Sequence, residues 1–468
     1  MQSARYDVLV VGGGLAGLAA GNRCAEQGLT VALLERGAEE RYLCNSRISS
    51  GYFNCAWQSM SGDPALLKRA IDTETSGFAD PDLADAFARN AGPALEWLHA
   101  QGIETIRGGP HPTNSVLVTP PPLHRRGLEW QGLGADAMIG TLAAKFEQRG
   151  GRMLRAARAR ELIMASGRCV GALAMGASGD VRIEARAVLL ADGGFQADRE
   201  LLRRYVSPRP ERLVQRNAET GTGDGLRMAT AIGAATAGME WFYGHVLSRN
   251  AMNHSSLWPY PTLDIVVTSG IAVDAAGQRF VDEGLGGVYA ANAIAKLADP
   301  LSTFVVFDET VWQGEAKSTS RAPNALLVDW GGTLHRSESL DGIAQAAGIP
   351  PAALAKTVEQ FNQAIASSST GSINPPRSTS KYQPRRIERP PFYAAPLCAG
   401  ITYTMGGIAI DGECRVLRAD RSPIAGLFAA GSATGGHEGG PRAGYTGGLG
   451  KALTFGWLAG NRVAASLR

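Results

Sequence analysis

The sequence lacks the features that mark a membrane, metal or haem protein. Its apolar runs all fall short of the roughly 18 residues that a membrane-spanning helix needs. Its six cysteines form no CxxC pair, no other metal-ligand spacing and no CxxCH haem motif; they are Cys24, Cys44, Cys55, Cys169, Cys398 and Cys414. We therefore expect buried, reduced thiols, no bound metal ion and no haem within this chain.

The chain also lacks a large excess of positive or negative charge. The 46 lysines and arginines against 43 aspartates and glutamates leave a formal net charge of +3, too small to indicate nucleic acid or an anionic membrane as partner. Aromatic residues make up 7% and hydrophobic residues 44% of the 468 residues, a composition typical of a globular protein with two domains or one elaborated domain. An apolar run begins almost at the N-terminus and leaves no room for a signal peptide, so we expect a cytoplasmic protein.

Glycine, in contrast, is abundant, with 59 residues, and its most informative cluster lies near the start of the chain. An apolar run leads into Gly-Gly-Gly-Leu-Ala-Gly at 12–17, a helical stretch, and a second apolar run that ends in Glu35. Gly12 permits a tight turn, Gly14 lets the backbone approach a pyrophosphate, and Gly17 lets the helix pack on the strand. The carboxylate at the end of the second run can accept hydrogen bonds from a ribose. The pattern predicts a dinucleotide-binding βαβ unit.

Three later turns are also candidates for contact with the cofactor. A buried parallel strand is predicted to end in Asp192, the glycine turn 221–225 precedes a helix, and the apolar run 426–430 leads to Gly431. A last helix is predicted from about residue 448 to the C-terminus. Because these turns follow strands near both ends of the chain, we expect both ends to build one cofactor domain.

The organisation along the chain predicts an α/β protein whose cofactor domain is discontinuous. Residues 1–234 form its first part, and residues 371–468 form its second part after a linker rich in Ser, Pro and Arg. Residues 235–370 have fewer glycine turns and a mixture of helical and strand patterns, so they are expected to form an inserted α+β capping domain. Two stretches, 37–60 and 103–134, are predicted as loops.

Five segments, in the same order along the chain, resemble the FAD-dependent fumarate reductase and succinate dehydrogenase flavoprotein superfamily, and within it the branch of tricarballylate and 3-ketosteroid dehydrogenases. They are residues 12–35, 45–51, 191–195, 222–225 and 403–431. The resemblance covers nearly the whole chain. It implies bound FAD in a Rossmann-like domain of the glutathione reductase type, with the inserted domain as a mobile cap.

The resemblance also implies which residues hold the cofactor. Asn45 stands where membrane-bound members carry a histidine bonded covalently to the flavin, so FAD is expected to be held non-covalently. Ser432 stands where the family usually has a glutamate, and Gly448 with Leu449 match a helix start whose positive end would stabilise the anionic reduced flavin. The implied FAD contacts are Gly12, Gly14, Ala16, Gly17, Glu35, Arg36, Asn45, Ser46, Ser50, Gly51, Asp192, Gly193, Asp224, Gly431, Ser432, Gly448 and Leu449.

Four residues are implied as catalytic. Arg442 matches an arginine that grips a substrate carboxylate, a task that suits a guanidinium, and His245 matches a substrate-binding histidine at the start of the cap. Tyr403 occupies the place of a second substrate histidine, where a phenol can polarise a carbonyl or take a proton. Fumarate reductases carry a catalytic arginine shortly after a motif that matches 277–283 here, but the next stretch of this chain has none and offers only Tyr289.

Several further side chains are weaker candidates for the site, because each also has a simple structural explanation. They are the basic turn at 124–126, His437 and Glu438 near a strand end, the carboxylate pair Asp282 and Glu283, and Tyr52 with Phe53 beside the flavin loop.

These expectations together predict an FAD-dependent dehydrogenase that introduces a carbon–carbon double bond beside a carboxylate or ketone of a small organic acid or cyclic keto acid. A tyrosine would take the α-proton, and flavin N5 would accept the β-hydride. A separate protein, a quinone or oxygen would accept the electrons. The missing arginine argues against ordinary fumarate reduction, but an enoate reductase fed by an electron-transfer partner stays open. The alternative from another class is an FAD-binding electron-transfer subunit.

Overall fold

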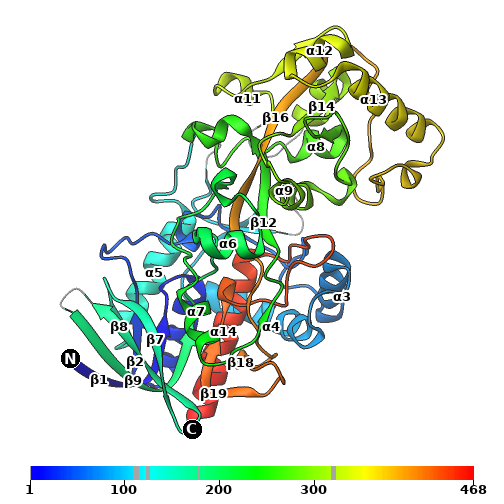
Figure 1. Cartoon of the computed structure of the whole chain (residues 1–468). Helices are drawn as coiled ribbons and strands as arrows, with labels where there is room; N and C mark the ends of the chain where they lie inside the picture. The colour runs from blue at the N-terminus through cyan, green and yellow to red at the C-terminus, as the bar shows by residue number, and fades with distance from the viewer. Residues whose placement is uncertain (1, 109–114, 123–126, 177–178, 318–322) are drawn as a thin grey trace.

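The computed structural model describes residues 2–108, 115–122, 127–176, 179–317 and 323–468. Figure 1 shows two regions: a lower one, where both termini lie beside a large sheet, and an upper one around the strands β14 and β16. Within the described residues, no helix is long and apolar enough to cross a membrane. All six cysteines are buried and unpaired, as the sequence predicted.

The first sheet joins the two ends of the chain. Its parallel strands lie in the order β19 (Pro423–Ala429), β9 (Gly179–Leu190), β1 (Gln2–Val11), β2 (Val31–Leu34) and β6 (Arg152–Leu154), and β18 (Arg415–Leu417) pairs antiparallel with β19. Val8 of β1 lies opposite Val31 on one side and Ala187 on the other. These runs are apolar because both faces of the sheet are covered. The predicted α/β architecture with a cofactor region built from both chain ends is confirmed.

Helices α1 (Leu15–Glu26) and α14 (Gly448–Leu467) pack closely against each other. A Cβ atom on Gly456 would lie 2.4 Å from the Ala16 carbonyl oxygen, and one on Gly460 would lie 2.7 Å from that of Ala20. Glycines on α14 therefore let the first and last helices of the chain approach backbone to backbone. The other helices of this region are α2 (Asn45–Ile48), α3 (Pro64–Thr75), α4 (Pro81–Ala100), α5 (Gly134–Gln148), α6 (Arg199–Tyr205) and α7 (Asp224–Ala231).

Short strands correct two of the predicted loops. The stretches 37–60 and 103–134 contain α2 and a small antiparallel sheet of β3 (Tyr52–Phe53), β5 (Val116–Val118) and β4 (Thr105–Arg107). Strands this short are below the length at which an alternating pattern becomes visible in a sequence. Longer strands predicted near 162 and 171 are present as β7 (Arg158–Ala165) and β8 (Arg168–Gly176), which extend the first sheet beside β9. A further pair is β11 (Thr236–Ala237) with β17 (Gly407–Ile408).

The second sheet is organised around one long strand, β16 (Phe392–Thr404). It pairs antiparallel with β12 (Phe242–Ser248), β14 (Phe304–Asp308) and β15 (His335–Ser337) and parallel with β10 (Val214–Gln215), while β13 (Ile271–Val273) pairs with β14. The accompanying helices are α8 (Asp264–Ser269), α9 (Gly287–Ala295), α10 (Glu309–Gln313), α11 (Leu326–Asp329), α12 (Leu340–Ala347) and α13 (Pro351–Ala366).

Strand β16 connects the two regions (Figure 1). Its first half pairs with β14 and β15 in the upper region, and its second half pairs with β12 and ends at Tyr403 and Thr404. The strand lies beyond residue 371, so the second sheet uses a segment that the sequence assigned to the cofactor domain. The boundaries at 234 and 371 stay a prediction.

Candidate active site

Two adjoining cavities form the candidate site. The first has an empty volume of about 840 Å³ and the second about 1190 Å³, both open to solvent, and they share Asn45, Ser46, Ser432 and Ala452. Their joint space is large enough for an extended cofactor with a small molecule beside it.

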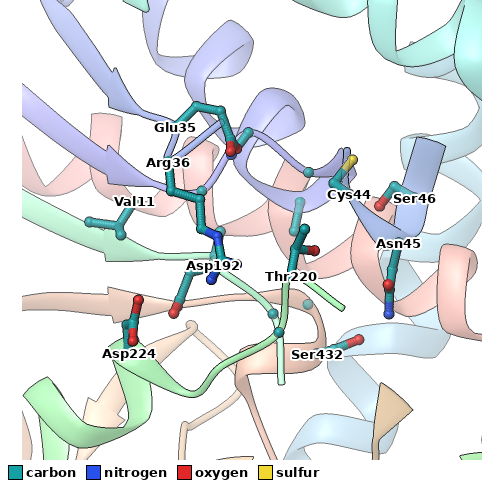
Figure 2. Close-up of a pocket in the computed structure, with 18 of the residues that line it drawn as sticks. Val11, Glu35, Arg36, Cys44, Asn45, Ser46, Asp192, Thr220, Asp224 and Ser432 are labelled. Carbon is teal, nitrogen blue, oxygen red and sulfur yellow. The ribbon is translucent and has the colours of Figure 1, made fainter. Parts of the chain in front are cut away.

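The first cavity lies where β1, β2, β9 and β19 end. Figure 2 shows labelled side chains from these strand ends and from the loop before α2 around a common space. Twelve of the residues predicted to bind the cofactor line it: Gly12, Gly14, Ala16, Glu35, Arg36, Asn45, Ser46, Asp192, Gly193, Asp224, Gly431 and Ser432.

The glycine turn after β1 has the geometry that the sequence predicted. Gly12 has φ +104°, and a Cβ atom there would lie 2.6 Å from the Ala191 carbonyl oxygen. Gly17 lines neither cavity; its Cβ would lie 1.9 Å from the Gly12 carbonyl oxygen, so it serves the packing of helix on turn. Helix α1 starts after Gly14, and its first amide, that of Leu15, donates to the Ser46 hydroxyl at 3.2 Å. The positive end of the helix dipole at this place can attract an anion in the cavity. This turn fits a pyrophosphate.

Asp192, at the end of β9, carries an unsatisfied acceptor. Its Oδ2 accepts a hydrogen bond of 2.7 Å from the Gly225 amide, while its buried Oδ1 has no partner among the described residues. Burial raises the pKa of Asp192 from 3.8 to about 6. A cofactor hydroxyl group that donates to Oδ1 would remove this cost, because an unpartnered buried acceptor is unfavourable. The donor set of the first cavity therefore fits a cofactor with phosphates and hydroxyls.

Glu35 and Asp224 are less available than the sequence suggested. The two Glu35 oxygens accept from the amides of Gly13 at 3.0 Å and Gly37 at 2.7 Å, and burial raises the pKa of the carboxyl group. A carboxylate has further lone pairs, so a ribose hydroxyl can still donate to it. Burial works to raise the pKa of Asp224, but two Arg158 hydrogen bonds of 2.7 Å hold it below the usual value.

The second cavity lies between the first cavity and the second sheet. Its predicted residues are Ser50, Gly51, Tyr403, Gly448 and Leu449, besides the shared Asn45, Ser46 and Ser432. Its wall is aromatic, with Tyr52, Tyr243, Trp258, Tyr260, Tyr403 and Tyr445. The side chain of Asn45 bridges the backbone, since Nδ2 donates to the Thr402 carbonyl at 3.0 Å and Oδ1 accepts from the Ala218 amide at 2.9 Å.

Three neighbouring tyrosine rings stand at one edge of the second cavity. The Tyr243 ring lies 5.3 Å from that of Tyr403 and 4.1 Å from that of Tyr445. The Tyr445 oxygen accepts a hydrogen bond of 3.1 Å from the Gly448 amide, the first amide of α14. The cavity edge thus combines a phenol with a helix N-terminus.

Tyr403 is tied to a fully buried ion pair. Its hydroxyl donates to the Glu438 carboxylate at 3.0 and 3.2 Å, and Lys451 donates to Glu438 at 3.4 Å. Burial, followed by the charge of Glu438, raises the pKa of Tyr403 well above its ordinary value. The geometry therefore disfavours a Tyr403 phenolate, one of the two roles that the sequence predicted.

His245 reaches the second cavity only through a neighbour. Its Nδ1 lies 2.5 Å from Asp264 Oδ2, and its Nε2 lies 3.1 Å from the hydroxyl of Tyr243, which lines the cavity. His245 itself lines neither cavity.

The other two predicted catalytic residues are not brought to the site. Arg442 is exposed on the loop before α14, and Tyr289 is half-buried on α9; neither lines the first or the second cavity. Arg442 is separated from the site because its loop folds on itself, with Gly439 and Gly444 bonded to each other.

Most of the weaker candidates have structural roles. His437 is buried between the rings of Phe87 and Phe455, and burial lowers its pKa well below the ordinary value. Asp282 accepts from the amides of Gly284 and Ser378. Glu283 forms an ion pair with Arg279, and Phe53 lies in the core. Tyr52 lines the second cavity, and residues 124–126 lie outside the described residues.

Sequence reasoning missed Arg216, which lines the second cavity. It follows β10 and is 9% exposed. Its Nε donates to the Pro259 carbonyl at 3.2 Å and its Nη1 to the Thr402 hydroxyl at 3.0 Å, and its guanidinium lies over the Tyr260 ring at 5.3 Å. No carboxylate forms an ion pair with it in the part of the chain that the structure describes. No motif surrounds it, so the sequence carried no signal for it.

The βαβ turn, the strand-end cavity and its donor set define a dinucleotide-binding flavoprotein. The chain belongs to the FAD binding domain family, whose profile matches residues 7–448. It binds FAD and is an FAD-dependent oxidoreductase related to the fumarate reductases, as the resemblance implied.

The relatives of this chain include a reductase and a dehydrogenase. The chain is 27% identical to fumarate reductase (cytochrome) of Shewanella frigidimarina, over 98% of this chain and 77% of that protein. It is 31% identical to 4-oxocyclohexanecarboxylate 2-dehydrogenase of Sinomonas cyclohexanicum, over 70% of this chain and 60% of that protein. The crystal structure of 3-ketosteroid delta1-dehydrogenase from Sterolibacterium denitrificans shares the fold, with a TM-score of 0.75 at 21% identity over 99% of this chain and 100% of that one.

Proposed function

We propose that this flavoprotein is a dehydrogenase that forms a carbon–carbon double bond beside the ketone of a small, cyclic keto acid. The observation that carries the proposal is Arg216, a cation without a carboxylate partner among the described residues, in the same aromatic cavity as the Tyr445 hydroxyl and the start of α14. When bound, FAD supplies the acceptor for the hydride that leaves the substrate.

Arg216 is the residue that we assign to the substrate carboxylate. A nearly buried guanidinium with only neutral partners is unfavourable, and an anion in the cavity would compensate its charge. Two neutral acceptors hold the Nε and Nη1 atoms, which fixes the planar group and leaves Nη2 to donate to a carboxylate. Arg442, which the resemblance implied for this role, is exposed outside the cavity.

The edge formed by Tyr445 and Gly448 is assigned to the ketone. A phenol can accept and donate at once, so Tyr445, whose oxygen accepts from the Gly448 amide, is the group proposed to donate a hydrogen bond to the carbonyl oxygen of a bound ketone. The positive end of α14 lies at the same place and stabilises negative charge that develops on that oxygen. Both effects make the carbon beside the carbonyl more acidic, which is the requirement for removing its proton.

The oxidative direction is favoured over reduction. The stretch 284–290 contains no arginine to act as the proton donor of a fumarate reductase. One relative is named 4-oxocyclohexanecarboxylate 2-dehydrogenase, and the molecule in that name carries both a ketone and a carboxylate, the two groups of the substrate proposed here. An enoate reductase is the second candidate, because the fumarate reductase relative matches 98% of the chain. The electron acceptor is proposed to be a separate protein, a quinone or oxygen.

The proposal is tested by mixing the FAD-loaded protein anaerobically with single compounds and following flavin absorbance. The compounds are 4-oxocyclohexanecarboxylate, cyclohexanone, cyclohexanecarboxylate and tricarballylate. We expect rapid bleaching by the keto acid and slower or no bleaching by the molecules that lack one of its two groups. Bleaching by none of them, together with reoxidation of chemically reduced flavin by an unsaturated acid, would instead establish the reductase.

A further inference from the structure

We propose that Tyr243 is the catalytic residue that takes the proton from the carbon beside the carbonyl, and that His245 and Asp264 are positioning residues behind it. The inference rests on the proposed function and assigns its proton transfer to three residues, the Tyr243 relay. Sequence reasoning placed His245 against the substrate and did not single out Tyr243 or Asp264.

The hydrogen bonds of the relay have a defined direction. A carboxylate only accepts, so the hydrogen between Asp264 Oδ2 and His245 lies on Nδ1, at 2.5 Å between the heavy atoms. With the ring neutral in this tautomer, which is the state that the proposed step requires, Nε2 accepts and the Tyr243 hydroxyl, 3.1 Å away, donates to it. The second oxygen of Asp264 accepts from the Val246 amide at 2.8 Å, which holds the carboxylate in place. The arrangement resembles that of an activated nucleophile, in which a hydroxyl group donates to a histidine base and a carboxylate orients the histidine.

The sequence builds this arrangement on β12. Tyr243 and His245 are two residues apart, so both side chains leave the same face of the strand, and their rings meet edge to face at 5.2 Å. A bulge after Tyr243 places it opposite Tyr403, while His245 lies opposite Gly400, which has no side chain.

The glycine-rich stretch before α9 supports Asp264. A Cβ atom on Gly287 would lie 2.1 Å from Asp264 Cγ, so only glycine lets the start of α9 pack on the carboxylate. This is the stretch in which the sequence lacks the arginine of fumarate reductases. In this chain it holds the carboxylate that orients His245.

The proposed step conserves charge within the relay and the substrate. The carbon–hydrogen bond beside the carbonyl breaks, its proton moves to the Tyr243 oxygen, and its electron pair stays on the substrate. The original Tyr243 hydrogen moves to His245 Nε2 at the same time, so no phenolate accumulates, and Asp264 stabilises the resulting imidazolium. The side chains of His245 and Asp264 are 12% and 24% exposed, so the proton can afterwards leave to solvent.

The neighbouring Tyr403 is a poorer proton acceptor. Its partners Glu438 and Lys451 are 0% exposed, and Lys451 also donates to the Thr434 carbonyl at 3.0 Å. A proton passed to Glu438 would therefore have no contact with water. The rings of the two tyrosines are tilted by 37° and lie 5.3 Å apart, but of the two only Tyr243 has partners that reach the surface.

The test separates proton transfer from hydride transfer. The FAD-loaded protein is reduced with dithionite, which blocks hydride acceptance, and 4-oxocyclohexanecarboxylate is incubated with it in D₂O. Exchange of the hydrogens beside the ketone is followed by NMR, and binding of the keto acid is followed by its effect on the flavin spectrum. We expect Y243F, H245Q and D264N to slow exchange by at least about 100-fold with little change in binding. Y403F should slow it less, and Y393F, a matched change in the upper part of β16, should not affect it.

Each outcome of this experiment supports or contradicts the Tyr243 relay. Exchange by Y243F at the wild-type rate, or no exchange by a wild-type protein that binds the keto acid, overturns it. Exchange that depends on Tyr243 without flavin bleaching in the oxidised protein supports the relay and contradicts the proposed dehydrogenase. Bleaching that persists in Y243F supports the dehydrogenase and contradicts the relay.

Discussion

The first and second cavities meet at four residues, yet they are built in opposite ways. The first is shaped mainly by backbone, that is, by glycine turns at strand ends and by the start of α1. The second is shaped by side chains that arrive from β12, β16, the loop after β10 and the start of α14. At Gly12 the backbone of the first cavity leaves no room for an added Cβ atom, whereas the second cavity can change its specificity through single side-chain substitutions. We infer that the first cavity fixes the cofactor and the second selects the substrate.

The largest effect is expected from adding one methyl group behind the glycine turn that shapes the first cavity, at a position that lines neither cavity. In Gly17→Ala the new Cβ would lie 1.9 Å from the Gly12 carbonyl oxygen, so the turn must open. We expect FAD binding to weaken by more than about 100-fold and the free energy of unfolding to fall by about 3 kcal/mol. Flavin absorbance after gel filtration and a denaturant titration measure both. The matched control is Gly140→Ala on the exposed face of α5, where a Cβ meets nothing within 4 Å and should stabilise the protein by up to about 1 kcal/mol.

The next largest effect concerns the charge of the second cavity. Arg216→Met should weaken binding of a keto acid by about 100-fold and leave binding of cyclohexanone almost unchanged, because only the acid uses the guanidinium. Arg216→Lys keeps the charge but not the planar fork, so we expect about a tenfold loss. Titrations monitored by the flavin spectrum provide the dissociation constants. Equal weakening for acid and neutral ketone would remove Arg216 from carboxylate recognition.

A smaller effect is expected from Asp192. The folded apoprotein holds a proton on Asp192 up to about pH 6, whereas the unfolded chain releases it near the ordinary pKa of 3.8. The folded state thus binds more protons in this window, so the stability of the apoprotein should fall as the pH rises from about 4 to 6, by up to about 3 kcal/mol. Asp192→Asn should remove this pH dependence, because an amide does not titrate in this range. It should weaken FAD binding by about tenfold, because the NH₂ group replaces one of the two acceptor oxygens of Asp192 with a donor. Thermal melts of the two apoproteins at several pH values check the sign.

The smallest effect is expected from the arginine that the resemblance favoured. Arg442→Met changes an exposed side chain outside both cavities, so the dissociation constant for a keto acid should change by less than about twofold. The variant is measured beside Arg216→Met under the same conditions. A loss at Arg442 as large as that at Arg216 would mean that the loop before α14 moves into the cavity.

The same division explains how far the sequence could predict the molecule. Gly12, Gly14 and Asp192 were predictable because a turn at a strand end needs particular residues at a fixed spacing. Arg216 and Asp264 were not, because they come from loops and short elements whose approach depends on the pairing of β12 and β10 with β16. Strand β16 itself lies after the predicted linker, and its place in the second sheet has no local signal in the sequence.

Tyr403 and Tyr243 show the limit of motif transfer. The motif placed Tyr403 at the site, where it lies, but the buried Glu438 and Lys451 that determine its chemistry lie far along the chain. Tyr243 lies two residues before His245, but the motif pointed only to His245. A contact between the two rings is visible only in the folded strand.

The central claim, oxidation beside a ketone in an anion-binding cavity, is tested most directly by identifying the product of a single anaerobic turnover. The FAD-loaded protein is mixed with an equimolar amount of 4-oxocyclohexanecarboxylate, and the small molecule is analysed by NMR and mass spectrometry. We expect one bleached flavin for each molecule that has lost two hydrogens and gained a double bond beside the ketone. Recovery of the unchanged keto acid, with saturation of an added unsaturated acid by the dithionite-reduced protein, would contradict it.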